Sequence, residues 1–302
     1  MPHKPVLLQE TLRLLALRSG DIVVDGTLGN AGHAMEIIKT IGLTGRLIGL
    51  DQDASSISRC QERLKPYPQA TLHQENFINL DKILDSLNIR FVNAVLLDVG
   101  FSAEQIDDPE RGFSFNHPGP LDMRMNVQQS MKARDLVNDL SEEDLAEIFY
   151  RFGDERRARK FAYAICQSRR QKPIETTEDL VGVLEGALPR SLKFEKGRRP
   201  KHARHHPVTR VFQALRIAVN DELGCLEKAL PKIWERIGQK GRLGVITFHS
   251  SEDRIAKYFF RDLSQKRQAF LVTKKPVVPS RSEMLENRRA RSAKLRVAEK
   301  TG

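Results

Sequence analysis

The sequence predicts an α/β fold built on a parallel β-sheet, with a helical segment inserted into it. Two observations lead to this prediction. Four short apolar runs occur in the first hundred residues, at 21–25, 46–51, 70–73 and 93–98, with stretches of helical composition between them. Strands and helices that alternate at this spacing are typical of βαβ units. From about residue 105 to residue 207, by contrast, no apolar run typical of a buried strand occurs.

The helices of the first two thirds of the chain follow from composition and capping signals. Between the predicted strands, helices are expected around 33–40 and 54–64. In the insertion, Ser141 is followed by three acidic residues, a capping box that opens a helix through Phe149. A further helix is expected within 155–170.

The last third of the chain returns to the sheet. One long helix is expected from about Thr209, because apolar residues recur three and four positions apart. These residues are Phe212, Leu215, Val219, Leu223, Leu226 and Leu230. A buried strand is then expected within 241–250, and a closing antiparallel pair is expected from 270–278 and 293–298.

Length and composition exclude several classes of protein. The chain has 302 residues, of which 40% are apolar and 29% charged, so we expect roughly two globular domains and exclude wholesale disorder, collagen and a coiled-coil rod. There is no long apolar stretch and no secretory h-region at the start, so we expect a cytoplasmic protein without a membrane segment. The three cysteines, Cys60, Cys166 and Cys225, form no Cys-x-x-Cys pair, and we therefore expect no metal site and no disulfide framework.

Positive charge is concentrated in two segments. The net charge is +11, and residues 190–210 hold eight basic residues against one acidic residue, while residues 281–300 hold seven against three. These two segments account for the whole excess, and local basic patches indicate a phosphate-rich partner such as nucleic acid. The alternative is a solvated loop and a solvated tail.

A glycine-rich turn follows the first predicted strand. Residues 25–33 read Asp-Gly-Thr-Leu-Gly-Asn-Ala-Gly-His, which is not the Gly-x-Gly-x-x-Gly of dinucleotide folds. An Asp at the strand end beside a wider loop suits a ligand with a cationic amino-acid portion. Asp51, at the end of the second strand, stands where a carboxylate accepts two ribose hydroxyls. Together these features favour S-adenosylmethionine over NAD, whereas the turn alone is equally consistent with a purely structural role.

Two further residues stand at the predicted ligand edge of the sheet. Asp98 ends the fourth strand, and open α/β sheets bind ligands at the carboxyl ends of their strands. Phe77, after the third strand, is placed to stack on adenine. The alternatives are a helix cap for Asp98 and a core position for Phe77.

Five motifs are specific enough to indicate a protein family. They lie at 24–29, 107–115, 119–125, 206–217 and 248–250. With these motifs the chain resembles the bacterial family of small-subunit ribosomal RNA cytosine-N4 methyltransferases, from His3 to about Glu299. The resemblance implies a Rossmann-like, seven-stranded class I methyltransferase core at 1–106 and 208–302, with an inserted helical RNA-recognition domain at 107–207. It also implies methylation of N4 of a cytidine in the decoding region of 16S ribosomal RNA, within the small ribosomal subunit.

The resemblance also implies a set of cofactor contacts. Carried onto this sequence, the contacts to S-adenosylmethionine fall on Gly29, Ala31, Gly32, His33, Asp51, Phe77, Asp98 and Gln105. Of these, His33 and Gln105 are not indicated by the residues alone. The family usually has Gly-Arg-Gly-Gly-His where this chain has Gly29-Asn30-Ala31-Gly32-His33, so an extra methyl group enters the loop.

Candidates for catalysis and RNA binding complete the hypothesis. Asp98 and the pair His249 and Ser250 are candidate acceptors for the amino hydrogens of cytosine, and His249 is alternatively a cap. Asn220 and Arg216, on a polar stripe of the predicted long helix, are candidates to hold the base or its phosphate. Further RNA contacts are expected in the first basic segment, at Arg198, Arg199, Lys201 and Arg204.

Three other functions stay open at this point. A DNA cytosine-N4 methyltransferase usually carries a Ser/Asp/Asn-Pro-Pro-aromatic tetrapeptide after the fourth strand, and residues 98–101 read Asp-Val-Gly-Phe. A small-molecule methyltransferase would not need the basic segment at 190–210. A binding protein without turnover is disfavoured because the ligand positions are intact.

Overall fold

The computed structural model describes residues 5–188 and 207–302, and the chain divides by packing into two units. The core unit comprises Met1–Phe101 and Leu223–Gly302, and the inserted unit comprises Ser102–Glu222. The inserted unit was predicted at 107–207, and the larger difference is at its C-terminal boundary, which lies at residue 222. The helix after residue 207 buries its apolar face among the helices of the insertion, which assigns it to the inserted unit.

The core unit contains a seven-stranded sheet in the order β3-β2-β1-β4-β5-β7-β6, which confirms the α/β prediction. The strands are β1 (Ile22–Asp25), β2 (Arg46–Asp51), β3 (Ala70–Gln74), β4 (Val92–Asp98), β5 (Ile237–Thr247), β6 (Ala269–Leu271) and β7 (Lys294–Lys300). Neighbouring strands from β3 to β5 are parallel, and β7 runs antiparallel to both β5 and β6.

The closing antiparallel pair is shorter than predicted. β6 ends at Leu271, whereas the predicted range extends to residue 278. Pro276 lies in this range and lacks the N–H that a strand needs. Beyond Leu271, the N–H of Thr273 still donates to the Val297 carbonyl, and an isolated bridge joins Val277 to Leu295. The segment between β6 and β7 instead forms α13 (Arg281–Glu286) and η4 (Arg288–Ser292).

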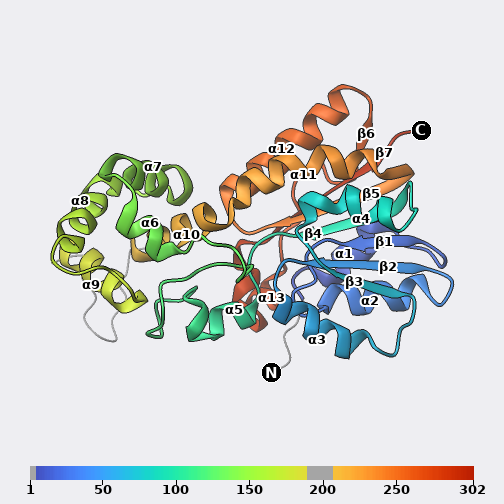
Figure 1. Cartoon of the computed structure of the whole chain (residues 1–302). Helices are drawn as coiled ribbons and strands as arrows, with labels where there is room; N and C mark the ends of the chain where they lie inside the picture. The colour runs from blue at the N-terminus through green and yellow to red at the C-terminus, as the bar shows by residue number, and fades with distance from the viewer. Residues whose placement is uncertain (1–4, 189–206) are drawn as a thin grey trace. The chain divides into compact units, whose positions relative to one another are not determined.

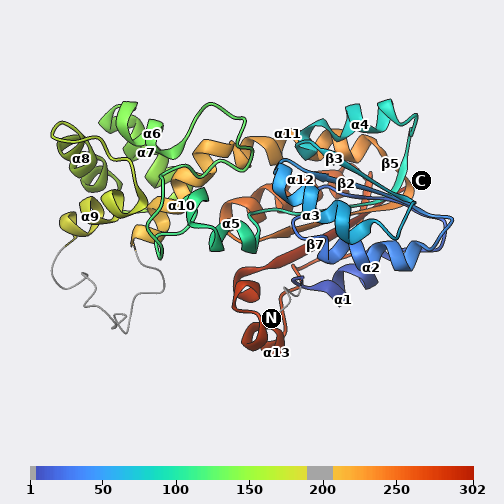
Figure 2. The ribbon, with the colours of Figure 1, turned by 60° about the horizontal axis from the view of Figure 1, so that its bottom comes forward.

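Helices cover both faces of the sheet (Figures 1 and 2). On one face lie α1 (Leu8–Leu15), α2 (Gly32–Ile41) and α3 (Ala54–Leu64), whose buried residues form one apolar cluster with the sheet. On the other lie α4 (Leu80–Ser86), α11 (Glu222–Glu235) and α12 (Ser250–Gln265), which share a second cluster. The carboxyl ends of the parallel strands are left for the loops that carry the predicted site.

The inserted unit is helical in the part that the structure describes. Its elements are α5 (Ala103–Asp107), η2 (Pro109–Arg111), α6 (Ala133–Asp139), α7 (Glu142–Gly153), α8 (Ala158–Arg169), α9 (Thr177–Ala187) and α10 (Pro207–Asn220). Ser141 caps α7 as predicted, and its hydroxyl accepts the N–H of Asp144. Phe149, Phe161 and Leu215 are fully buried in a separate apolar core of this unit.

The prediction of one long helix after Thr209 is wrong. The helix breaks between α10 and α11 at Asp221, whose φ of 45° is left-handed, a conformation that Asp tolerates better than most residues. The apolar stripe continues through the break, but Phe212 packs in the inserted unit whereas Leu226 packs against the sheet. In the described part of the chain, no helix is long and apolar enough to span a membrane.

Candidate functional site

The loop after β1 is held close to the sheet by backbone hydrogen bonds. The Gly26 N–H donates to the Leu96 carbonyl, and a Cβ at residue 26 would lie 2.5 Å from Leu97 Cδ2. Gly29 has a left-handed φ of 52°, and its N–H donates to Asp51 Oδ2 at 2.8 Å. Both glycines are therefore required by close approach or by backbone conformation.

Asp51 organises this loop from the end of β2. Besides the bond from Gly29, its Oδ1 accepts the N–H of Asp53 at 2.9 Å. Each carboxylate oxygen has two lone pairs, so each retains the capacity to accept one more hydrogen bond. Burial raises the pKa of Asp51 to about 6 despite these two donors. The predicted role of Asp51 toward ribose hydroxyls stays compatible with its contacts.

Asp98 ends β4 with an oxygen that no protein group satisfies. Its backbone N–H donates to Thr27 Oγ1 at 2.6 Å. In the described part of the chain, Asp98 Oδ1 is buried and has no hydrogen-bond partner. Burial, together with the nearby carboxylates of Asp25 and Glu252, raises the pKa of Asp98 to about 8. A buried polar atom without a partner is uncommon, and at a strand end it indicates a missing ligand or water.

Asp25 completes a row of three carboxylates. It ends β1, which lies between β2 and β4, so Asp51, Asp25 and Asp98 stand at three neighbouring strand ends. Burial, together with the nearby charge of Asp51, raises the pKa of Asp25 to about 7. In the protein alone, burial disfavours the ionised form of each of these groups. A cationic ligand at this edge would favour the ionised form and be attracted to it.

His33 connects the site to the N-terminal segment. It is buried near the start of α2, where its Nε2 lies 3.0 Å from the Val6 carbonyl and its Nδ1 lies 3.7 Å from Asp98 Oδ2. The preceding Gly32 lies against Pro5, since a Cβ at residue 32 would be 3.0 Å from Pro5 Cβ. Ala31, where the family usually has glycine, is buried and adopts a left-handed φ of 57°. The extra methyl group is thus accommodated in a conformation that L-residues disfavour.

Phe77 opens the short helix η1 (Phe77–Asn79) after β3 and is half-buried. Its side chain packs against the apolar cluster under α4, and its Cβ would lie 3.3 Å from a Cβ at residue 26. The core position that was the alternative for Phe77 therefore accounts for part of its surface. Its predicted stacking on adenine stays a prediction.

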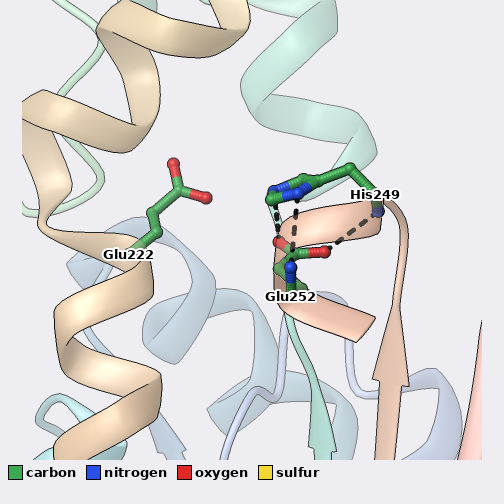
Figure 3. A group of neighbouring side chains, drawn as sticks. All are labelled: Glu222, His249 and Glu252. Carbon is green, nitrogen blue, oxygen red and sulfur yellow. Dashed lines mark hydrogen bonds and ion pairs between the residues drawn. The ribbon is translucent and has the colours of Figure 1, made fainter. Parts of the chain in front are cut away.

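His249 and Ser250 follow β5, the strand next to β4. Figure 3 shows His249 beside Glu252. His249 is the N-cap of α12, and its Nε2 lies 2.9 Å from Glu252 Oε1. Glu252 is 2% exposed, and its Oε2 accepts the N–H of Phe248 at 2.8 Å and of His249 at 3.2 Å. Ser250 is exposed at the first position of the helix. His249 thus has the capping role that was the alternative, and its role as a proton acceptor stays a prediction.

Three predicted residues belong to the inserted unit. Asn220 donates both amide hydrogens, to the Met123 and Arg216 carbonyls at 2.8 Å each, and its Oδ1 accepts the Met125 N–H at 2.8 Å. Both amide hydrogens of Asn220 are engaged and the residue fixes the 123–125 segment, so its assignment to the catalytic group stays a prediction.

Arg216 and Gln105 are also engaged within the inserted unit. Arg216 is buried and forms a bidentate pair with Glu222, through Nε at 2.8 Å and one terminal nitrogen at 3.0 Å. This pairing neutralises the charge that the RNA-binding prediction relied on. Gln105 is buried, and its Oε1 accepts the Ser102 N–H in a capping box, which leaves its cofactor role a prediction. Arg198, Arg199, Lys201 and Arg204 lie outside the described residues.

Two residues of the site were not singled out from the sequence. Thr27 orients the end of β4 through its hydroxyl, and Glu252 holds the turn after β5 through its carboxylate. The second had a signal, since Glu252 follows His249 by three residues, the spacing of a capping box. The first had none, because its partner is a backbone group 71 residues away.

Comparison with known proteins assigns the chain to a family. The model of the MraW methylase family matches residues 1–301. A protein of Halothermothrix orenii named ribosomal RNA small subunit methyltransferase H is 43% identical over 99% of both chains. A protein of Geotalea uraniireducens with the same name is 45% identical, over 99% of this chain and 98% of its own length. With the whole chain matched and identities well above 30%, this protein is a member of the MraW methylase family.

Proposed function

We propose that the protein transfers the methyl group of S-adenosylmethionine to the N4 amino group of a cytidine in the decoding region of 16S ribosomal RNA. Membership of a methylase family supports the type of reaction, and the names of the relatives support the small-subunit ribosomal RNA as substrate. The motif resemblance set out above supports the N4 position and the decoding region. The structural observation that carries the proposal is the row of carboxylates at the ends of β2, β1 and β4.

The residues at this row fit the cofactor. S-adenosylmethionine supplies a methyl group bound to a sulfonium cation and carries an α-ammonium group as well. Asp98 offers a buried oxygen without a partner among the described residues, and burial raises the pKa of Asp25 and of Asp98, so a cation beside them would favour their ionised forms. Asp51 would hold the ribose, and the backbone of the Gly29 turn leaves room for close approach.

The amine of cytosine needs acceptors more than it needs a strong base. Its lone pair is delocalised into the ring, so it is a poor nucleophile, and its proton becomes acidic only as the N–C bond forms. An acceptor positioned on the amino hydrogens accelerates such a step. To take up the proton, Asp98 must be ionised. Because its pKa is raised to about 8, a nearby positive charge would favour that form. His249, held by Glu252, is the second proposed acceptor.

Reaching the amine requires the base to leave its stack. Enzymes that modify a base either act on single-stranded substrate or extrude the nucleotide, at a cost of about a few kcal/mol in unstacking. Contacts to the phosphates on either side offset that cost, and we assign this role to basic residues, including Arg198, Arg199, Lys201 and Arg204 of the first basic segment.

The experiment that tests the proposal is methyl transfer from tritiated S-adenosylmethionine to small ribosomal subunits that lack the modification, followed by nucleoside mass spectrometry. The expected product is N4-methylcytidine at one position of 16S ribosomal RNA. Naked 16S RNA and duplex DNA serve as the two comparison substrates. Methylation of DNA only, of another atom of the base, or of no substrate would overturn the proposal.

A further inference from the structure

The structure sorts six of the seven basic residues of the second basic segment, 281–300, into two groups. Lys294 and Arg296 both pair with Asp253, at 3.1 and 2.7 Å, and the ammonium of Lys300 donates to backbone carbonyls of residues 234 and 237 at 2.8 Å. These three side chains serve the fold. Arg281, Arg288 and Arg291 are exposed on α13 and η4, and within the described residues none of them has an ion-pair partner.

The three exposed arginines lie at the edge of the sheet that carries the row of carboxylates. β7 is antiparallel to β5, and its first residue, Lys294, pairs with Thr247 at the carboxyl end of β5. The segment that ends at Ser292 therefore enters the sheet at the carboxyl edge. Both ribbon views place α13 at this end of the sheet, close to the start of the described chain (Figures 1 and 2).

A short series of contacts links α13 to Asp98. Glu283 of α13 accepts the N–H of Leu7 at 2.7 Å, and the neighbouring Val6 carbonyl lies 3.0 Å from His33 Nε2. The other nitrogen of His33 lies 3.7 Å from Asp98. The position of α13 is thus fixed relative to the proposed methyl-transfer site by contacts within the core unit. The arginines on either side of Glu283 stand beside that site and not on a remote surface.

We propose that Arg281, Arg288 and Arg291, the arginine edge, bind the phosphodiester backbone of the RNA substrate beside the target nucleotide. The proposal rests on the proposed function, because it takes RNA as the substrate of the neighbouring site. Charge complementarity carries it, since three uncompensated guanidinium groups on about a dozen residues match a chain of phosphates, and guanidinium groups bind phosphate bidentately. The fold engages Lys294, Arg296 and Lys300 in internal contacts and leaves these three arginines at the solvent-exposed rim of the site.

The test replaces Arg281, Arg288 and Arg291 together by Gln and measures binding of a fluorescently labelled 16S RNA fragment that contains the decoding region, at several salt concentrations. Three lost phosphate contacts should lower the slope of log K against log salt by about 2 for a single strand, at roughly 0.7 per contact. If the affinities converge near 1 M salt, the loss is about 50-fold at 0.15 M, an estimate from the same slope. Under single-turnover conditions, the RNA concentration for half-maximal rate should rise by a similar factor, with the maximal rate within threefold of wild type.

A matched control removes equal charge at the opposite edge of the sheet. Arg18, Lys65 and Arg90 are exposed, and they precede β1, β3 and β4 at their amino ends. Their replacement by Gln should leave RNA affinity and its salt slope unchanged. Thermal unfolding and S-adenosylmethionine affinity, measured on both triple variants, establish that each is folded and has an intact cofactor site.

The outcomes separate this proposal from the proposed function. If wild type methylates 16S RNA but the arginine-edge variant binds RNA with the wild-type affinity and slope, the arginine edge is only solvated surface. Equal losses in both triple variants would also overturn the proposal, because they would reflect net charge alone. If wild type methylates nothing but the arginine-edge variant alone loses RNA affinity, the proposed function fails and the RNA site stands.

Discussion

Binding of S-adenosylmethionine is expected to release protons from the carboxylates at the ends of β1 and β4. Burial raises the pKa of Asp98 to about 8 and that of Asp25 to about 7, so both groups are largely protonated in the ligand-free protein below neutral pH. A sulfonium or ammonium cation favours their ionised forms and lowers both pKa values. The affinity must therefore increase as the pH rises, because fewer protons then have to be displaced.

The magnitude follows from Asp98 alone. With a pKa of about 8, the carboxylate is roughly 1% ionised at pH 6 and half ionised at pH 8. If the bound cofactor requires the ionised form, the affinity should increase about 50-fold between these two pH values. Asp25 titrates in the same direction over a lower range, so it adds to the increase below pH 7.

Titration calorimetry between pH 6 and pH 8, in pairs of buffers with different ionisation enthalpies, measures both the affinity and the number of protons released. Asp98→Asn keeps the shape of the side chain but has no proton to lose, and it should flatten the pH dependence while weakening binding at pH 8. S-adenosylhomocysteine, which lacks the sulfonium charge, should release fewer protons. A wild-type affinity that is constant from pH 6 to pH 8, with no protons released, would refute the assignment of these carboxylates to a cationic ligand.

Substitutions at three residues test their roles one at a time. Asp51→Ala should weaken S-adenosylmethionine binding by about 1.5 to 3 kcal/mol in calorimetry, the size of lost hydrogen bonds to a charged group, and unchanged affinity in a folded variant would exclude it from the site. His249→Ala should lower the single-turnover rate about 100-fold, and His249→Asn, which keeps a good N-cap, should be equally slow; a rate within threefold of wild type would leave only the cap. Asn220→Ala should lower the free energy of unfolding in urea by about 3 kcal/mol, since it leaves buried backbone groups of residues 123 and 125 without partners, and a loss under 1 kcal/mol would contradict this structural role.

The strands of the sheet and their ligand edge were predictable because two independent signals coincide there. An apolar run marks a buried strand, and Asp25, Asp51 and Asp98 each mark the point where such a run meets polar surroundings. Since the carboxyl ends of parallel strands meet at one edge, the row of carboxylates follows from topology. The break at Asp221 had no such signal, because apolar spacing continues unchanged from one helix into the next while the two helices pack in different units.

The polar stripe of the predicted long helix shows a related limit of periodicity. Periodicity shows that Arg216 and Asn220 avoid the apolar face, but it does not show whether they face solvent, a ligand or another part of the chain. Their partners are Glu222 and the backbone of residues 123 and 125, the latter almost a hundred residues away. A buried polar side chain is usually satisfied by the protein itself, so polarity at helical spacing is weak evidence for a binding role.

Asp98 shows the opposite case, in which burial without a partner is the informative feature. A carboxyl group whose pKa is raised in the folded state makes the protein less stable as the pH rises from the unfolded pKa toward the folded one, because ionisation is easier in the unfolded chain. The same holds for Asp25 and, over a narrower range, for Asp51. Three such groups on adjacent strands are an unfavourable arrangement for the fold alone. A cation bound at this edge would favour the ionised carboxylates and so oppose this destabilisation, which links the unfavourable burial of the three carboxyl groups to the ligand that they are proposed to bind.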